Sequence, residues 1–371
     1  MKNHSLRRSL LLFLSGMLFP VVTVLAAPGL QVIVDAESAK ANIALLGKKQ
    51  VTDQELNDAA ALYGNQQLIA KVKSYSGAGK DVFISTLKAM IIDGNIKGDD
   101  PYNWRSVKAA LPEMKQLIGQ IDANSASFIE EVKNSILSYT PAGLDITIKA
   151  CFLAGGGALG FTIGNDKTFN VALQKLDNDF NAMKLLVAHE LYHIVQAEGQ
   201  SMRKKTITGK DPYFLQATAA LLENLWSEGS ANLAGDFAGF EGKSAFAKEQ
   251  TAEWAKNADR RRENFALFEA VLYKSYYDTS AKRYEQHYNI CFSTAYDETA
   301  YFTGYEMAKA IVKYKGRKAL ADLVLADPAN FIAAYIDIYK SEKDSRLIRF
   351  DASTEAIVAE MLQRSREWVK P

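Results

Sequence analysis

The chain has 371 residues and an almost balanced charge, with 44 basic and 43 acidic side chains and a formal net charge of +1. Because mixed charges without a basic excess show no bias toward nucleic acid, we expect no nucleic-acid partner. The length allows roughly two domains of ordinary size. The only two cysteines are Cys151 and Cys291. They could pair in an exported protein, but no Cys-x-x-Cys pattern indicates a cysteine-ligated metal site.

Residues 1–26 have the pattern of a secretory signal. An apolar stretch at 10–25 follows three basic residues and ends in a small-residue cleavage motif, Val24-Leu25-Ala26. The stretch is shorter than the ~20 residues that a spanning helix needs, and Pro20 interrupts it. We therefore expect an exported protein, periplasmic or secreted, without stable membrane insertion after cleavage; an uncleaved anchor is the alternative. Cleavage would remove three positive charges and no acid, which changes the formal charge from +1 to −2.

The segment 27–143 is predicted to be mainly helical and to form an N-terminal lobe. Two capping boxes, Thr52–Glu55 and Ser127–Glu130, each precede an apolar helical pattern. Pro112 can occupy a first helical turn. Nothing in this segment suggests catalysis, so we expect it to build one wall of the molecule.

From Leu144 the pattern changes to short strands. Residues 145–149 alternate between apolar and polar side chains, as a half-buried strand does. Residues 161–163 and 168–171 flank a polar turn, which predicts a hairpin with one apolar face. Three glycines at 155–157 lack the Gly-Lys-Ser/Thr ending of a phosphate loop and lead into a strand rather than a helix. We expect them to allow close backbone approach.

The stretch at 181–199 is predicted to be a helix that is apolar nearly all round and belongs in the interior. It carries the sequence His189-Glu190-Leu191-Tyr192-His193. The two histidines are four residues apart, so they project from one face about 6 Å apart, which suits two nitrogen ligands of one zinc ion. Glu190 is then angled toward a metal-bound water. The alternative, two core histidines and a surface glutamate, would leave three polar groups needing separate partners.

A second helix is predicted from about Tyr213 to Ala234. Glu228 and Asn232 lie on the same inward-facing side of this helix as Leu221 and Leu225. A different side, expected to be exposed to solvent, carries Glu223, Ser227 and Ser230. A buried carboxylate needs a hydrogen-bonded partner or a metal. We therefore predict Glu228 as the third zinc ligand, with an internal salt bridge as the alternative. Asn232 could orient one of the zinc ligands through a hydrogen bond. If Glu228 is not the third ligand, His287 is the next candidate.

These residues resemble the gluzincin branch of the zincin metallopeptidases, in which His-Glu-x-x-His is joined by a glutamate from a following helix. Within it, Glu228-Gly229-Ser230-Ala231 is similar to the Glu-Gly-x-Ala of secreted bacterial zinc peptidases. Tyr301-Phe302-Thr303-Gly304 is similar to the Tyr-x-x-Gly of gluzincin aminopeptidases, whose tyrosine steadies the transition state. The resemblance covers 144 to about 315. It implies that Tyr301 stabilises the oxyanion, with Tyr305 and His287 as the next candidates; Tyr301 could equally be a packing residue.

Two departures limit this resemblance. The chain after His193 lacks the further Gly and His of metzincins, which excludes that branch. No Gly-Ala-Met-Glu-Asn stretch, which holds a substrate's amino terminus in aminopeptidases, is present. The resemblance therefore implies a zinc peptidase without indicating an aminopeptidase.

We expect a mainly helical α+β protein with a zincin-like core at 144–240, where a small sheet covers the metal-binding helix, and a helical C-terminal lobe at 241–371. One Zn²⁺ would keep a fourth position for water, and Glu190 would take the proton as that water attacks a peptide carbonyl. The peptide or protein substrate would lie extended along the 161–171 hairpin. The alternatives are an exported, non-catalytic metal-containing binding or scaffold protein, and a zinc amidohydrolase acting on a non-protein amide.

Overall fold

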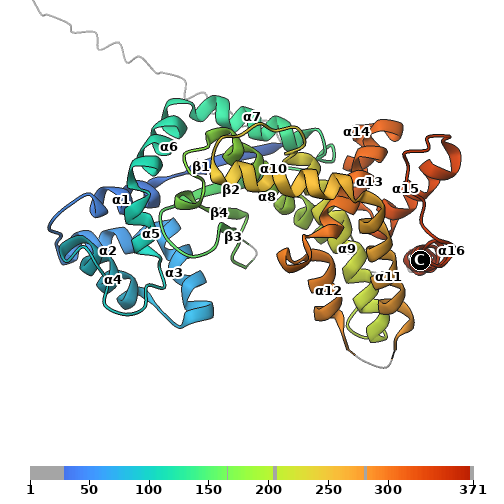
Figure 1. The fold of residues 1–371 in the computed structure, drawn as a ribbon, viewed down its shortest axis with the longest axis horizontal. Helices are drawn as coiled ribbons and strands as arrows, with labels where there is room; N and C mark the ends of the chain where they lie inside the picture. Colours follow the sequence, from blue (N-terminus) through green and yellow to red (C-terminus); the bar gives the residue numbers. More distant parts are fainter. Residues whose placement is uncertain (1–28, 165, 204–206, 280–281, 368–371) are drawn as a thin grey trace, which may run out of the picture.

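The computed structural model describes residues 29–164, 166–203, 207–279 and 282–367. Most of these residues are helical, and a single four-stranded sheet accompanies the helices. Figure 1 shows the sheet and helices α1 to α6 in one half, helices α11 to α16 in the other, and α8 between them. The predicted mainly helical α+β fold is confirmed.

The N-terminal helices follow one another closely. Their bounds are α1 (Glu37–Leu46), α2 (Asp53–Ala61), α3 (Tyr63–Ser76), α4 (Lys80–Ile92), α5 (Trp104–Ala109), α6 (Leu111–Ala123) and α7 (Ser125–Leu137). The capping box at α2 is confirmed, because Thr52 Oγ1 accepts from the Glu55 N–H at 3.2 Å and Glu55 accepts from the Thr52 N–H at 2.8 Å. Pro112 occupies the first turn of α6 as predicted.

The second predicted capping box is wrong. Helix α7 already begins at Ser125, with Asn124 as its N-cap, so Ser127 lies inside the first turn. There its hydroxyl donates to the Asn124 carbonyl oxygen at 3.0 Å instead of accepting from a backbone N–H. A serine one turn inside a helix commonly makes this backward bond, and the sequence pattern does not distinguish the two positions.

The sheet has the strand order β1-β2-β4-β3, with β1 (Leu30–Asp35), β2 (Ile146–Leu153), β3 (Gly160–Phe161) and β4 (Thr168–Ala172). Strands β1 and β4 both run parallel to β2, whereas β3 is antiparallel to β4. The predicted hairpin is therefore present, with Phe161 opposite Asn170, although β3 is only two residues long. Strand β3 forms one edge of the sheet.

Strand β1 was missed because the sequence analysis assigned its segment to helices. It pairs with β2 far along the chain, with Leu30 opposite Ile146, so no hairpin turn marks it. This pairing joins the predicted N-terminal lobe to the predicted core. The domain boundaries at 143 and 240 stay a prediction.

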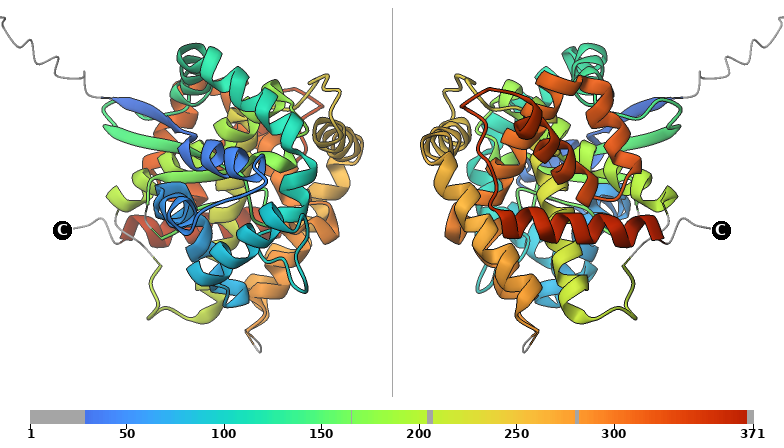
Figure 2. Two further views of the ribbon diagram at one scale, coloured as in Figure 1. Left: turned by 90° about the vertical axis from the view of Figure 1, so that its left-hand side faces the viewer. Right: turned by 90° about the vertical axis from the view of Figure 1, so that its right-hand side faces the viewer.

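Helices cover the sheet, which leaves β4 entirely buried. Helix α8 (Phe180–Met202) packs on β2 and β4 and also contacts α7, while α1 and α3 contact β2. Figure 2 shows helices in front of the strands and behind them. Parallel strands covered in this way are apolar along their length, as Ala150 to Leu153 of β2 are.

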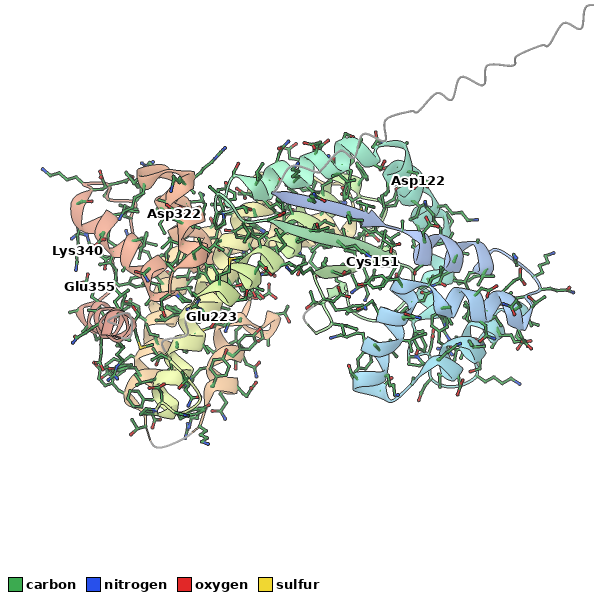
Figure 3. The ribbon with its side chains drawn as sticks, turned by 180° about the vertical axis from the view of Figure 1, so that it is seen from behind. Asp122, Cys151, Glu223, Asp322, Lys340 and Glu355 are labelled. Carbon is green, nitrogen blue, oxygen red and sulfur yellow. The ribbon has the colours of Figure 1, made fainter. Side chains whose placement is uncertain are left out.

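Helix α9 (Tyr213–Ala234) is the central helix of the C-terminal half, in the range the sequence predicted. It packs against α8, α11 and α13. The remaining helices are α10 (Ala245–Asp259), α11 (Arg261–Tyr277), α12 (Tyr284–Phe292), α13 (Thr299–Lys315), α14 (Arg317–Asp322), α15 (Ala329–Ser341) and α16 (Ala352–Glu367). Figure 3 marks α9 by Glu223, among the C-terminal helices.

The two cysteines do not pair. Cys151 in β2 and Cys291 in α12 are both fully buried and free. Burial raises the pKa of each thiol to about 12, so neither is a reactive thiolate near neutral pH.

The predicted signal at 1–26 lies outside the described residues, and export stays a prediction. Within the part of the chain that the structure describes, no helix is long and apolar enough to cross a membrane.

Candidate metal centre

Helix α8 holds the two candidate histidines on a buried scaffold. It begins after Asp179, whose carboxylate accepts from the Ala182 N–H at 3.0 Å. Val187 and Leu191, on either side of the His-Glu pair, are fully buried. The side chains of His189 and His193 keep exposed fractions of 14% and 23%, so the imidazoles remain within reach of solvent.

Three side chains meet in one small triangle. The Nε2 atoms of His189 and His193 lie 3.1 Å apart. Glu228 Oε2 lies 3.1 Å from Nε2 of His193 and 3.6 Å from Nε2 of His189. Bonds of about 2.0–2.1 Å in a tetrahedral zinc site would place neighbouring ligand atoms about 3.3 Å apart. The two nitrogens and one oxygen therefore fit a single zinc ion in both chemistry and spacing.

The carboxylate and the two imidazoles of this triangle stabilise one another's charged forms, an arrangement that a bound cation would replace. Burial alone would lower the pKa of His193, but the carboxylate of Glu228 outweighs it and raises that pKa to about 9. Burial likewise opposes ionisation of Glu228, yet the two imidazoles hold its pKa well below the usual range. Such strongly shifted groups, gathered at one point, are typical of functional sites.

Glu190 lies beside the triangle, next to His189 on α8. Burial and the charge of Glu228 raise the pKa of Glu190, against the opposing effect of the two histidines. It does not belong to the group of ligand atoms formed by His189, His193 and Glu228. A carboxylate with a raised pKa is suited to accepting and returning a proton.

The family comparison agrees with this geometry. A family model described as "Putative zinc dependent peptidase (DUF5700)" matches residues 56–344, well over half of the chain. The chain belongs to this family. Comparison with curated proteins and with solved structures gives no match. The matched region contains α8 and α9, and thus the three candidate ligands His189, His193 and Glu228.

Polar side chains behind His193 include residues that the sequence analysis missed. His193 Nδ1 lies 2.8 Å from Gln196 Oε1 and 3.1 Å from Ser227 Oγ. Ser227 and Ser230 of α9, which the sequence analysis placed on a solvent-exposed face, point inward instead: Ser230 is fully buried, and Ser227 contacts Gln196 of α8. The signal was available in part: Gln196 follows His193 by three residues and so lies on the same helix face.

The predicted orienting role of Asn232 stays a prediction. It is buried one turn after Glu228. Within the described ranges, however, it makes no hydrogen bond to His189, His193 or Glu228. The side chains that contact His193 come from Gln196 and Ser227 instead.

Tyr301 lies in the first turn of α13 and is half-buried. Burial, together with the charges of Glu228 and Glu298, raises its pKa further above the ordinary value. The hydroxyl therefore stays protonated at every physiological pH and can donate a hydrogen bond. Its ring centroid lies 6.0 Å from that of Phe292 in α12.

Tyr305 and His287, the next candidates after Tyr301 from the sequence, have different surroundings. The hydroxyl of Tyr305 donates to the carboxylate of Asp236, with distances of 2.9 and 3.0 Å to its two oxygens. His287 is buried in α12, where burial and the charge of Arg283 lower its pKa. It lies outside the triangle of candidate ligand atoms.

Glu298 was not singled out from the sequence. It precedes α13 with a left-handed φ of 49°, next to Asp297 with a φ of 60°. Asp297 is fixed by ion pairs with Lys256 at 2.5 Å and Arg260 at 2.8 Å. Burial, followed by the charge of Glu228, raises the pKa of Glu298, which adds a second carboxylate to the surroundings of the triangle.

A cavity of about 400 Å³ opens beside His193. One wall comes from the β3–β4 connection and the other from α8, with Thr162, Gly164, Lys167, Ile194, Ala197 and Ser201 among the lining residues. An ion pair of 2.8 Å between Lys167 and Glu198 joins the two walls. The cavity thus lies along the hairpin that the sequence analysis proposed as the substrate-binding strand.

Proposed function

We propose that this protein is an exported, gluzincin-type zinc peptidase in which His189, His193 and Glu228 hold one zinc ion. The observation that carries the proposal is the triangle of two imidazole nitrogens and one carboxylate oxygen, with sides of 3.1, 3.1 and 3.6 Å. Zinc sites with two histidines and one glutamate are open and catalytic rather than structural. Zinc held there would supply Lewis acidity, which polarises a carbonyl and lowers the pKa of a water to about 7.

Glu190 is the general base in this proposal. It accepts a proton from the water that attacks the peptide carbonyl and then passes that proton to the leaving amine. Its raised pKa supports the second transfer, because a carboxylic acid with a higher pKa is formed more readily at neutral pH. A binding protein would have no need of a carboxylate at this position.

Tyr301 is the proposed oxyanion donor. As the carbonyl carbon becomes tetrahedral, negative charge develops on its oxygen, and a protonated hydroxyl can stabilise that charge by donating a hydrogen bond. The raised pKa of Tyr301 keeps this hydrogen in place. The charges of Glu228 and Glu190 both contribute to that pKa, which supports its position near the triangle.

Strand β3 is the proposed docking edge for the substrate. It lies at the end of the sheet and pairs on one side only, with β4. An extended peptide can add to such an edge through backbone hydrogen bonds. The cavity between this hairpin and α8 leads to His193 and would receive a substrate side chain.

The decisive experiment combines zinc analysis with hydrolysis of a peptide library by the purified protein. We expect one zinc per chain and peptide cleavage that a chelator abolishes and added zinc restores. Glu190→Gln should keep its zinc, because a glutamine cannot accept the proton but Glu190 is not a ligand, and hydrolysis should fall by ~10²–10⁴-fold. Replacing both histidines by alanine should remove zinc and activity together.

Two outcomes would overturn this proposal. Full zinc occupancy without cleavage of any peptide would favour the metal-containing binding protein, or an amidohydrolase if a non-protein amide were cleaved instead. Equal activity of the parent and Glu190→Gln would remove the proposed base from the mechanism.

A further inference from the structure

A buried amide lies directly behind His193. Gln196 has an exposed fraction of only 1%, and its Oε1 lies 2.8 Å from Nδ1 of His193. Nδ1 is the imidazole nitrogen opposite Nε2, which faces His189 and Glu228. Whatever group contacts Nδ1 therefore determines which nitrogen of the ring carries the hydrogen.

The partners of Gln196 fix the orientation of its amide. Its Nε2 lies 2.9 Å from the backbone carbonyl oxygen of Ser227 and 2.8 Å from Ser230 Oγ. A carbonyl oxygen can only accept, so the atom facing it must be the NH₂ group. The Ser230 hydroxyl donates to the Trp226 carbonyl oxygen at 2.6 Å, which leaves its lone pair for Gln196. Oε1 of Gln196 is consequently the atom that faces His193.

The orientation of the amide determines the state of the histidine. Because Oε1 of Gln196 can only accept, Nδ1 of His193 must be the donor, and Nε2 is left free to offer its lone pair to a metal. The Ser227 hydroxyl donates to the same Oε1 at 3.0 Å and holds it in place. We infer that Gln196 is a positioning residue that fixes the tautomer and ring angle of His193 for zinc binding. The inference rests on the proposed function, because it assigns a role toward the same zinc ion.

The arrangement is specific to one of the two histidines. Among the described residues, no side chain or backbone group makes a hydrogen bond with Nδ1 of His189. Control of ring orientation is therefore concentrated on His193.

The test compares three variants by zinc affinity, measured by competition with a chelator on the purified protein. Gln196→Met keeps the size and burial of the side chain but removes the acceptor. Gln196→Glu keeps the acceptor while losing the amide donors. The matched control is Gln174→Met, since Gln174 is also buried and bonds the backbone of Gly155 and Gly156, away from the triangle.

We expect Gln196→Met to weaken zinc binding by about 10- to 100-fold, the usual effect of removing a group that orients a ligand. Gln196→Glu should remain within a few-fold of the parent, and Gln174→Met should bind zinc as the parent does although it is destabilised. The Nδ1–H signal of His193 should be visible by NMR in the zinc-loaded parent and in Gln196→Glu, and lost in Gln196→Met. The same variants loaded with Co²⁺ should show a changed visible spectrum only for Gln196→Met.

The outcomes separate this inference from the proposed function. A parent protein that binds no zinc would overturn the proposed function itself. A parent that binds zinc tightly, with Gln196→Met equally tight, would overturn the role of Gln196 alone. Equal losses in Gln196→Met and Gln174→Met would show a general stability effect and would also overturn it. If Gln196→Met does not fold, loss of affinity and of the Nδ1–H signal in Gln196→Glu would count against the inference.

Discussion

Gly229 on α9 and Gly304 on α13 meet at the point where the two helices cross. A Cβ added to Gly229 would lie 2.2 Å from the carbonyl carbon of Gly304 and 2.3 Å from its Cα. Glu228 directly precedes the first glycine, and Tyr301 lies one turn before the second. Gly229 and Gly304 therefore form one close contact between α9 and α13. This contact sets the distance between the candidate zinc ligand Glu228 and the candidate oxyanion donor Tyr301.

Gly304→Ala should consequently disturb the site as well as the packing. A methyl group has no room at this backbone contact, so the helices must separate. We expect a loss of about 1–3 kcal/mol in the free energy of unfolding, together with weaker zinc binding as Glu228 moves from the histidines. Denaturant unfolding and chelator competition measure the two effects.

The control for this substitution is Gly119→Ala in α6. Gly119 is exposed, and an added Cβ would meet no atom within 4 Å. Alanine should therefore stabilise the helix by up to about 1 kcal/mol and leave zinc binding unchanged. An unchanged stability of Gly304→Ala would contradict the close contact.

Removal of the third candidate ligand gives a second prediction. Glu228→Ala should weaken zinc binding by far more than His287→Gln, because Glu228 Oε2 lies 3.6 and 3.1 Å from Nε2 of His189 and His193, whereas His287 lies outside this group of ligand atoms. His287 is the fallback ligand from the sequence, and its charged neighbours are Arg283, Asp278 and Lys274. Chelator competition distinguishes the two positions, and equal zinc affinity of Glu228→Ala and the parent would point to another ligand.

The helix that carries the candidate zinc ligands His189 and His193 could be predicted from sequence because its signal is local. The spacing of His189 and His193 on an apolar helix fixes their common face without any knowledge of the fold. Glu228 could be placed in the same way, from its position on the inward stripe of α9. These inferences needed only the helical period and the cost of burying a carboxylate.

Features that depend on distant partners could not be predicted in this way. Strand β1 pairs with β2, more than a hundred residues later in the chain, so no turn motif in the sequence indicates that pairing. From the sequence, Ser227 and Ser230 are expected to face solvent. In the structure they form hydrogen bonds with Gln196 of α8. Helical periodicity shows that side chains share a face, but not what that face contacts.

The capping box of α2 predicts how stability depends on pH. A hydrogen bond from Lys48, followed by the Thr52 backbone N–H, lowers the pKa of Glu55 to about 2. Since the folded-state pKa lies below the unfolded one, the stabilisation is present above about pH 4.5 and is lost as the pH falls toward 2. The parent should be more stable than Glu55→Gln at pH 6, and this difference should vanish near pH 2. Unfolding midpoints of both proteins across pH 2–7 provide the measurement; a constant difference would contradict the assignment.

Tyr301 and Tyr305 lie one turn apart on α13, and the sequence favours Tyr301 only through its resemblance to the Tyr-x-x-Gly motif. The structure separates them, because Tyr305 donates to Asp236 whereas Tyr301 lies among the charges of Glu228 and Glu298. Tyr301→Phe should lower kcat by ~10²–10³-fold, the usual cost of one oxyanion donor, with unchanged zinc content and stability. Tyr305→Phe should instead cost about 1 kcal/mol of stability through its lost hydrogen bond and change kcat little. Steady-state kinetics and unfolding curves measured on both variants test this assignment, and the reverse pattern would transfer the catalytic role to Tyr305.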